Sequence, residues 1–224
     1  MSSGKIYFVA TPIGNLGDTS LRAKEILSLV DTVVCEDTRV GGSFLHKLKI
    51  KKPLLSLHQH SDEEKIKRIV QETEIGKNFA YISDSGTPGI SDPGQKLARI
   101  AREFDIPIIP IPGPSALTAA ISVSGLVEKE FYFAGFLPKK KGRESKLKIL
   151  ATLKVPIVIY ESAPRIEKTL NQILQFFGSD VEIFIGREIT KKFEEYWGGD
   201  IELVISQLKN HESKGEFVLI VSKK

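Results

Sequence analysis

The chain of 224 residues has one cysteine, one methionine and one tryptophan, and it has no long apolar run. A membrane span needs about 20 consecutive apolar residues, and the N-terminal segment lacks the apolar core of a secretory signal. A single cysteine, Cys35, excludes an intrachain disulfide and a cysteine-rich zinc site. Because Cys35 ends an apolar segment, we expect a buried structural thiol. These absences predict a cytoplasmic protein with no membrane partner.

Two nucleotide-binding motifs are also absent, the Walker phosphate loop and the Rossmann glycine fingerprint. Their absence makes P-loop phosphoryl transfer and nicotinamide-dependent hydride transfer less favoured. Histidine is scarce, with four in the chain. His58 and His60 have only Asp62 or Glu63 nearby as further ligands, without the spacing of a zinc site. We therefore expect no metal centre.

What the chain does contain is three loops rich in glycine and proline, each following an apolar segment. Glycine adopts positive φ and lets a ligand approach the backbone, whereas proline fixes its own φ. In open α/β sheets, ligands bind at the carboxyl ends of the strands. A tight strand-to-helix turn capped by Asp84 would explain one such loop, but three on one sheet edge favour a backbone cradle for a small molecule. The loops are residues 11–15, 83–94 and 112–116.

The first half of the chain alternates short apolar segments with helical patterns. Its first helix is expected from Asp18, as N-cap, to Val30, and a later one opens with a capping box over residues 61–64. Asp92 and Pro93 supply an N-cap and a first-turn proline for another helix. Five short strands separated by helices predict a parallel, doubly wound sheet. The expected strands are residues 5–10, 32–35, 53–57, 79–82 and 106–111.

The regular alternation of strand and helix patterns changes after Ser115. This change predicts a second α/β lobe, joined to the first near residues 112–115. An amphipathic helix is expected over residues 164–177, and residues 187–195 are expected to form a polar turn. The expected strands of this lobe are residues 131–136, 156–160, 182–186 and 217–221.

Charge is unevenly placed in a chain whose formal net charge is +4. Between Pro138 and Lys148, six basic residues stand against one acidic residue, Glu144. Such a run is either a solvated face or a surface that contacts phosphates without sequence preference. Charged residues also follow three expected strands, where they are either surface ion pairs or a site that binds and deprotonates a sugar hydroxyl. These residues are Glu36–Arg39, Glu161 with Ser162, and Arg187–Glu188 with Lys191 and Glu194.

Seven segments resemble a known family. They are residues 9–18 (VATPIGNLGD), 35–39 (CEDTR), 83–94 (SDSGTPGISDPG), 110–118 (PIPGPSALT), 135–138 (GFLP), 187–191 (REITK) and 214–218 (KGEFV). Together they resemble the ribosomal small-subunit RNA cytidine 2′-O-methyltransferases (methyltransferase I). That family lies in the tetrapyrrole methylase, or class III, S-adenosylmethionine-dependent superfamily. The resemblance runs from about Ile6 to Val221.

The resemblance implies two α/β lobes, residues 1–113 and 114–224, with a mostly parallel five-stranded sheet covered on both faces and then a mixed sheet. It implies a homodimer that uses S-adenosylmethionine, bound between the lobes, to methylate a cytidine ribose 2′-oxygen in the decoding region of small-subunit rRNA, either free or in the assembled subunit. The implied cofactor residues are Pro12, Ile13, Asp84, Ser85, Gly86, Thr87, Ser115, Ala116 and Ala163. Catalytic candidates are Glu36, Asp37, Arg39, Glu161, Arg187, Glu188 and Lys191, and the RNA-binding candidates are Lys139, Lys140, Lys141 and Arg143.

The chain departs from the family pattern in two places. Residues 163–165 read Ala-Pro-Arg where the family usually has Pro-His-Arg, so no role of that histidine carries over. We also expect the small helical C-terminal extension of many members to be absent. Two alternatives stay open: a class III enzyme that methylates a tetrapyrrole or a modified protein, and a catalytically silent RNA-binding adaptor. The basic segments and the lack of histidine-rich clusters disfavour the tetrapyrrole.

Overall fold

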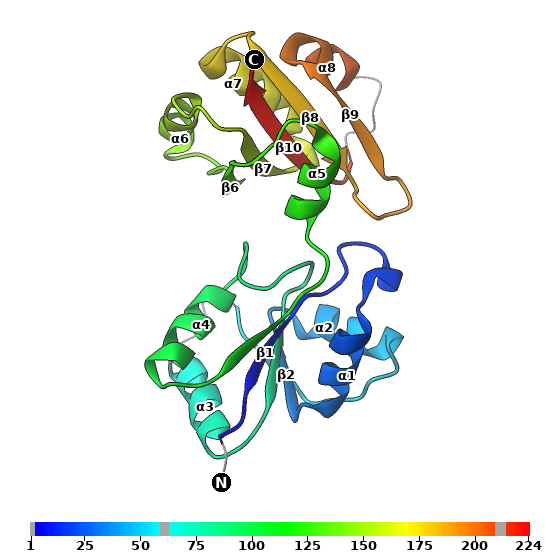
Figure 1. Ribbon diagram of the computed structural model, residues 1–224, viewed down its shortest axis with the longest axis vertical. Coiled ribbons are helices and arrows are strands. Elements are labelled where there is room, and N and C mark those ends of the chain that lie inside the picture. The colour runs from blue at the N-terminus through cyan, green and yellow to red at the C-terminus, as the bar shows by residue number, and fades with distance from the viewer. Residues whose placement is uncertain (1–2, 59–62, 209–213) are drawn as a thin grey trace. The chain divides into compact units, whose positions relative to one another are not determined.

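A computed structural model describes residues 3–58, 63–208 and 214–224 (Figure 1). The chain divides into two compact units, Met1–Ser115 and Ala116–Lys224. Each unit contains one five-stranded sheet and its own hydrophobic core. No helix of the described ranges is long and apolar enough to cross a membrane.

The N-terminal unit is built on a parallel sheet of short strands, as the sequence predicted. The strand order is β3-β2-β4-β1-β5, and every neighbouring pair is parallel. With helices on both faces, the central strands are apolar throughout, which is typical of parallel sheets. The strands are β1 (Ile6–Val9), β2 (Thr32–Cys35), β3 (Leu54–Ser56), β4 (Phe79–Ile82) and β5 (Ile108–Ile111).

Two helices cover each face of this sheet (Figure 1). On one face, α1 (Leu21–Leu29) and α2 (Thr38–Lys47) bury Leu27 and Leu45 against it. On the other, α3 (Glu63–Glu74) and α4 (Gly94–Glu103) bury Ile69 and Leu97. Cys35 is fully buried, as predicted. Burial, together with the nearby carboxylates of Asp84, Asp37 and Glu36, raises the pKa of its thiol to about 11, so it is not a thiolate nucleophile at neutral pH.

Helix starts in this unit differ from the sequence-based expectation. Asp18 ends a short 3₁₀ helix, η1 (Leu16–Asp18), and Ser20 caps α1 by accepting a hydrogen bond from the Ala23 N–H at 3.0 Å. Both residues are good N-caps, and the sequence pattern did not separate them. Of the expected capping box over residues 61–64, Ser61 and Asp62 lie outside the described residues.

The C-terminal unit holds the expected mixed sheet, in the order β6-β7-β10-β8-β9. The β6–β7 pair is parallel and the other three pairs are antiparallel. The expected strands are present as β6 (Tyr132–Phe136), β7 (Ile157–Ser162), β8 (Val181–Arg187) and β10 (Glu216–Lys223).

The edge strand β9 (Glu195–Asp200) was not expected from the sequence. Its Gly198–Gly199 pair is typical of a turn. In the structure, a Cβ at Gly198 would lie 2.5 Å from the Ile183 carbonyl oxygen, so glycine here permits close approach of two strands.

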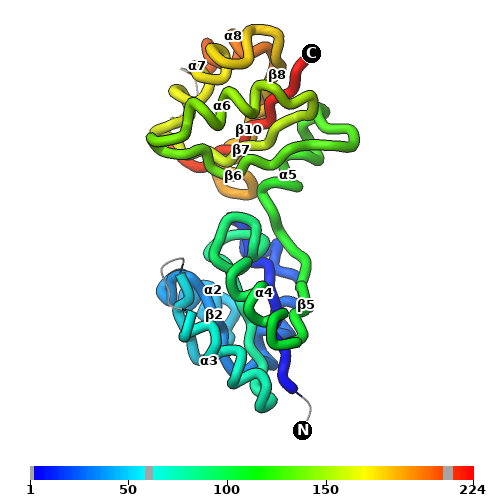
Figure 2. The backbone as a smooth tube through the Cα atoms, turned by 90° about the vertical axis from the view of Figure 1, so that its left-hand side faces the viewer, coloured from blue at the N-terminus to red at the C-terminus, as the bar shows by residue number. Residues whose placement is uncertain are grey.

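Three helices of this unit share one core with the sheet (Figure 2). They are α6 (Arg143–Ala151), α7 (Ile166–Phe177) and α8 (Ile201–Gln207), with the 3₁₀ helix η2 (Ala163–Arg165) leading into α7. Helix α5 (Ala116–Ser124) packs against β10 and β8. It is the first element of this unit along the chain.

Candidate functional site

The loops that follow β1, β4 and β5 are bonded to one another at the carboxyl edge of the N-terminal sheet. Thr11 and Gly86 exchange two backbone hydrogen bonds of 3.0 and 3.1 Å. The Thr11 hydroxyl also donates to the Ser83 carbonyl at 3.1 Å, and the Thr87 hydroxyl donates to the Pro114 carbonyl at 3.0 Å. The three glycine and proline loops therefore meet, as the sequence predicted. Buried Thr11 and Ser83, which tie them, were not singled out in the sequence.

Gly86 lies at the centre of this edge. Its φ is +83°, and a Cβ there would lie 3.2 Å from Ile13 Cγ2 and 3.6 Å from the Pro114 carbonyl oxygen. Left-handed backbone and a tight environment both require glycine. Asp84 and Ser85 are exposed beside it. Gly86 itself is buried, and its N–H and carbonyl are bonded to Thr11, so its lack of a side chain lets the loops pack closely. The exposed Asp84 carboxylate and Ser85 hydroxyl beside it suit the polar groups of a cofactor.

Asp92 closes the long loop between β4 and α4. Its carboxylate accepts hydrogen bonds from the Gly89 N–H at 2.8 Å, from the Gly94 N–H at 2.7 Å and from the Tyr81 hydroxyl at 3.2 Å. The helix N-cap is Pro93, one residue later than the expected Asp92. The Asp92 side chain therefore fixes the loop as well as the helix start.

Asp37 and Arg39 form an exposed pair after β2. The Asp37 carboxylate caps α2 by accepting from the Arg39 N–H at 2.8 Å, and the Arg39 guanidinium lies 2.6 Å from it. Hydrogen bonds from Arg39 lower the pKa of Asp37 to about 2. Asp37 is therefore ionised throughout the neutral range, where it is a weak proton acceptor.

Glu36, one residue earlier, has a different environment. It is partly buried, and within the part of the chain that the structure describes its carboxylate accepts no hydrogen bond and forms no ion pair. Burial raises its pKa to about 7, and the negative charges of Asp92 and Asp84 add to the rise. Burial also raises the pKa of Asp84. A carboxyl group that titrates near neutral pH at the carboxyl edge of a parallel sheet is suited to general base catalysis.

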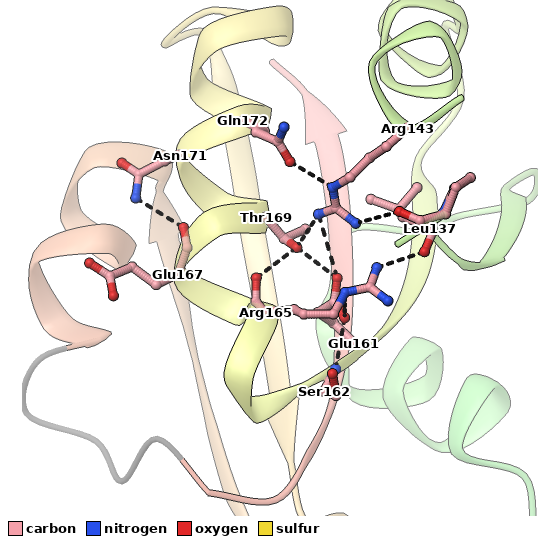
Figure 3. Close-up of polar contacts among 10 residues, drawn as sticks. Leu137, Arg143, Glu161, Ser162, Arg165, Glu167, Thr169, Asn171 and Gln172 are labelled. Atoms are coloured by element: carbon pink, nitrogen blue, oxygen red, sulfur yellow. Dashed lines mark hydrogen bonds and ion pairs between the residues drawn. The ribbon is translucent and has the colours of Figure 1, made fainter. Parts of the chain in front are cut away.

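In the C-terminal unit, Glu161 is the centre of a buried polar network (Figure 3). The residue is 1% exposed. Its Oε1 lies 3.1 Å from Arg165 Nε and accepts from the Ser162 N–H at 2.9 Å, while Oε2 lies 2.6 Å from the Thr169 hydroxyl. Both oxygens of this catalytic candidate are occupied within the unit, so the geometry gives it a structural role. Thr169, fully buried, was not singled out in the sequence.

Arg143 belongs to the same network and not to the surface. It is 4% exposed and donates to Gln172 at 2.7 Å, to Thr169 at 2.6 Å and to the Pro138 carbonyl at 3.2 Å. Among the four RNA-binding candidates it differs from the lysines, since Lys139, Lys140 and Lys141 are all exposed. A buried guanidinium that is hydrogen-bonded on three sides does not present its charge to a phosphate.

Arg187 and Lys191 hold the turn after β8. Arg187 is 2% exposed and donates to the Lys214 carbonyl at 2.8 Å. Glu188 and Thr190 have positive φ of 49° and 68°, so this turn is strained. The Lys191 ammonium lies 2.8 Å from Glu188 and 2.7 Å from Glu216. The turn therefore has one defined geometry and fixed charges.

The charge states of this turn follow from those contacts. Burial lowers the pKa of Lys191, but the hydrogen bonds to Glu188 and Glu216 outweigh it and the pKa is raised. Burial raises the pKa of Glu188, but the bonds from Lys191 and the Glu216 N–H outweigh it and the pKa is lowered. Lys191 thus stays protonated and Glu188 ionised at neutral pH. The pair supplies fixed charge and is unsuited to accepting a proton.

The remaining cofactor candidates are Ala116 and Ala163, and the two histidines considered as metal ligands follow β3. The Ala163 N–H donates to the Gly215 carbonyl at 3.2 Å, at the end of β7. Ala116 begins α5, whose next residue, Leu117, donates its N–H to the Tyr160 hydroxyl at 3.0 Å. His58 is exposed after β3, and His60 lies outside the described residues.

The chain matches a family described as tetrapyrrole (corrin/porphyrin) methylases over residues 5–204. It is 41% identical to "Ribosomal RNA small subunit methyltransferase I" of Synechocystis sp., covering 98% of this chain and 79% of that one. It is 42% identical to the protein of the same name from Thermotoga maritima, covering 99% of both. Among solved structures, a cobalt precorrin-4 methyltransferase is similar with a TM-score of 0.69 and 17% identity, covering 96% of this chain and 94% of that one. A uroporphyrin-III-C-methyltransferase of Thermus thermophilus has a TM-score of 0.65 and 19% identity, covering 98% of this chain and 92% of that one.

Proposed function

The chain belongs to the ribosomal RNA small subunit methyltransferase I family of the tetrapyrrole methylases, and from this we propose that it methylates the ribose 2′-oxygen of a cytidine in the decoding region of small-subunit rRNA. Relatives about 40% identical over nearly the whole chain carry the rRNA name, whereas the tetrapyrrole enzymes are below 20% identical and support the fold alone. Sequence similarity therefore favours RNA over a tetrapyrrole as substrate. We further propose that the protein acts in the cytoplasm as a homodimer.

S-adenosylmethionine is the proposed cofactor, and the edge around Gly86 fits it. Left-handed Gly86 lets the loops at this edge pack closely, since any side chain there would meet Ile13. Asp84 and Ser85 are exposed next to it, and Pro12, Ile13, Thr87 and Ser115 come from the loops bonded at the same edge. When bound, the cofactor supplies a methyl group on a positively charged sulfur. Ala116 and Ala163 are the two proposed contacts that belong to the C-terminal unit.

The chain's own residues supply alignment and proton acceptance. A ribose hydroxyl is a weak acid, so its proton must be accepted as the oxygen becomes a nucleophile. Among the carboxylates proposed as catalytic, Glu161 is enclosed by its own network, Asp37 is tied to Arg39, and Glu188 is tied to Lys191. Only Glu36 among them combines a pKa near 7 with a carboxylate that has no hydrogen bond or ion pair to any described residue. This observation carries our proposal that Glu36 is the base, while Arg39, Arg187 and Lys191 remain proposed sources of fixed positive charge.

We expect Gly86→Val and Asp84→Ala each to weaken S-adenosylmethionine binding. Valine at Gly86 would be strained by the positive φ and would enter the space next to Ile13, while Asp84→Ala removes an exposed carboxylate from the cradle. Isothermal titration calorimetry gives the dissociation constants. Gly125→Val is the matched control, because Gly125 also has positive φ, at 69°, but has nothing within 4 Å.

An unchanged affinity in both Gly86→Val and Asp84→Ala would remove this loop from the cofactor site. The same titration of the wild type tests the silent-adaptor alternative. An enzyme binds the cofactor in the absence of RNA or together with it, and a protein that binds RNA but never the cofactor would be an adaptor.

We expect reversal of Lys139, Lys140 and Lys141 to glutamate to raise the KM for ribosomal substrate and to flatten its salt dependence. The three lysines are exposed, and each phosphate contact adds to the dependence of binding on salt. The affinity for S-adenosylmethionine should not change. Reversal of Lys47, Lys49 and Lys51, three exposed lysines of the N-terminal unit, separates a local site from the effect of overall charge. Equal salt slopes in mutant and wild type would mean that residues 139–141 are simply a solvated face.

A further inference from the structure

The end of strand β6 carries a large aromatic side chain that the core does not use. Phe136 is the last residue of β6 and is 57% exposed. Three residues later begin the exposed lysines Lys139–Lys141. The Cα atoms of Phe136 and Lys139 are at most about 11 Å apart, and those of Phe136 and Lys141 at most about 18 Å, so the aromatic ring and the three lysines belong to one region of the surface. We name Phe136 together with Lys139–Lys141 the aromatic-basic surface.

A β-bulge places Phe136 on its face of the sheet. Phe133 pairs with Val158 and Gly135 pairs with Ile159, so Ala134 is one extra residue in β6. Gly135 has a positive φ of 61°. Without the bulge, residues three apart would point to opposite faces. With it, Phe133 and Phe136 both contact Tyr160, at ring-centroid distances of 5.0 and 5.6 Å.

These contacts orient Phe136 without covering it. Both rings meet Tyr160 edge to face, with interplanar angles of 72° and 62°. The Tyr160 hydroxyl is in turn held by the Leu117 N–H at 3.0 Å. Tyr160 thus supports the Phe136 ring from one side, while more than half of the Phe136 side chain stays exposed.

The buried arginine network fixes the backbone between Phe136 and the lysines (Figure 3). Arg165 donates to the Leu137 carbonyl at 2.6 Å, and Arg143 donates to the Pro138 carbonyl at 3.2 Å. Both guanidinium groups are paired with buried Glu161, at 3.1 and 3.7 Å. The loop is therefore held at its base from inside the protein, and its lysines project from a defined position. A merely solvated charge run would need no such support.

The chemistry of the aromatic-basic surface favours one kind of partner. Aromatic side chains stack on nucleobases, and nearby lysines neutralise the flanking phosphates, which is the common pattern of single-strand binding. The face of a base is available only where the nucleotide is unpaired. A second copy of this chain would bring the same lysines against these ones if paired across a two-fold axis, and like charges oppose that contact.

We propose that Phe136 stacks on an unpaired base of the RNA substrate while Lys139–Lys141 contact its phosphates. This inference rests on the proposed function, since it specifies how the methyltransferase captures rRNA. The bulge at Ala134 and the hydrogen bonds from Arg143 and Arg165 to the loop then hold the stacking ring and the lysines in fixed relative positions.

The test compares Phe136→Ala, Phe136→Leu and Phe136→Trp with wild type, using deproteinised small-subunit rRNA and small subunits that lack the methylation. Loss of one base–aromatic stack should raise the Kd and KM for RNA about 5- to 150-fold in the alanine variant. Leucine retains apolar volume but no aromatic face, so it should not restore binding, whereas tryptophan should. Phe104→Ala, which removes a 44% exposed phenylalanine of the N-terminal unit, is the matched control.

Three readouts separate stacking from other causes. The kcat at saturating RNA and the melting temperature should not change, and the salt slope of Phe136→Ala should equal that of the wild type because no phosphate contact is lost. Full RNA affinity in Phe136→Ala or Phe136→Leu would overturn the inference. A change of oligomeric state in sedimentation would overturn it too, because a second copy would then cover Phe136. RNA binding is measured separately from methyl transfer. Failure of the wild type to methylate rRNA would contradict the proposed function, whereas the comparison of RNA affinities would still test the stacking by Phe136.

Discussion

Methyl transfer by Glu36→Gln is expected to be slower than that of the wild type by about 10²-fold or more, the range for loss of an acid–base group. Glutamine keeps the size and polarity of the side chain but does not accept a proton at neutral pH. The measurement is single-turnover transfer with saturating cofactor and saturating RNA, so that changes in binding do not contribute. Asp37→Asn is the matched control, since it removes the neighbouring carboxylate, which is paired with Arg39.

The dependence of the methyl-transfer rate on pH tests the same role of Glu36. Only the ionised carboxylate accepts the proton, and the pKa of Glu36 is about 7, raised by burial and then by Asp92 and Asp84. The wild-type rate should therefore rise about tenfold per pH unit below pH 7 and level off above it. The rate of Glu36→Gln should not show this rise with pH. A flat profile, or a wild-type rate in Glu36→Gln, would exclude Glu36 as the base.

Protein stability provides an independent check on Glu36. Its folded-state pKa lies above its ordinary value of 4.5, so the folded state binds the proton more tightly. Stability then falls as the pH rises between about 4.5 and 7. Glu36→Gln cannot ionise, so its stability should not fall over this pH range for this reason, and the variant should be no less stable than the wild type at pH 8. A slower methyl transfer in a variant that is as stable as the wild type would show that Glu36 acts in function and not in folding.

We expect Glu161→Ala to lower the free energy of unfolding of the C-terminal unit by about 3–5 kcal/mol, the cost of breaking a buried ion pair by removing one partner. Glu161 is 1% exposed and its carboxylate pairs with Arg143 and Arg165, so its loss leaves both guanidinium groups without this counterion. Urea unfolding followed by Trp197 fluorescence reports on this unit, because the only tryptophan of the chain lies in β9.

Glu167→Ala is the control for Glu161→Ala, because Glu167 is an exposed glutamate of α7 whose backbone carbonyl, and not its carboxylate, accepts from Asn171. Its stability should stay within about 0.5 kcal/mol of wild type. If Glu161→Ala instead kept full stability and lost methyl transfer, Glu161 would be catalytic and the network would be secondary.

Local patterns were sufficient to predict the N-terminal sheet and the position of its loops. The five strands are short apolar segments, three of them (β1, β4 and β5) are followed by glycine and proline, and a parallel sheet brings the carboxyl ends of its strands to one edge. The contacts between loops were less predictable. The Thr11–Gly86 pair joins residues 75 apart, and no local pattern reports such a bond.

Burial explains why Arg143 and Glu161 were placed among exposed functional residues. Arg143 follows three lysines in the sequence, but it is four and seven residues before Leu147 and Leu150, and all three face inward on α6. Glu161 continues the two-residue alternation of Ile157 and Ile159, which both point into the core. The spacing contained a signal in both cases. The residue types pointed the other way, to exposed positions, because charged residues are rarely fully buried unless they are paired.

The chemical identity of the methylated product tests the proposed function most directly. Small ribosomal subunits from cells that lack the gene are incubated with the protein and S-adenosylmethionine carrying a labelled methyl group, and the rRNA is digested to nucleosides and separated. We predict label in 2′-O-methylcytidine from the small-subunit rRNA, greatly reduced with Glu36→Gln. Label in a base, in another nucleoside or in no RNA at all would contradict the proposed function.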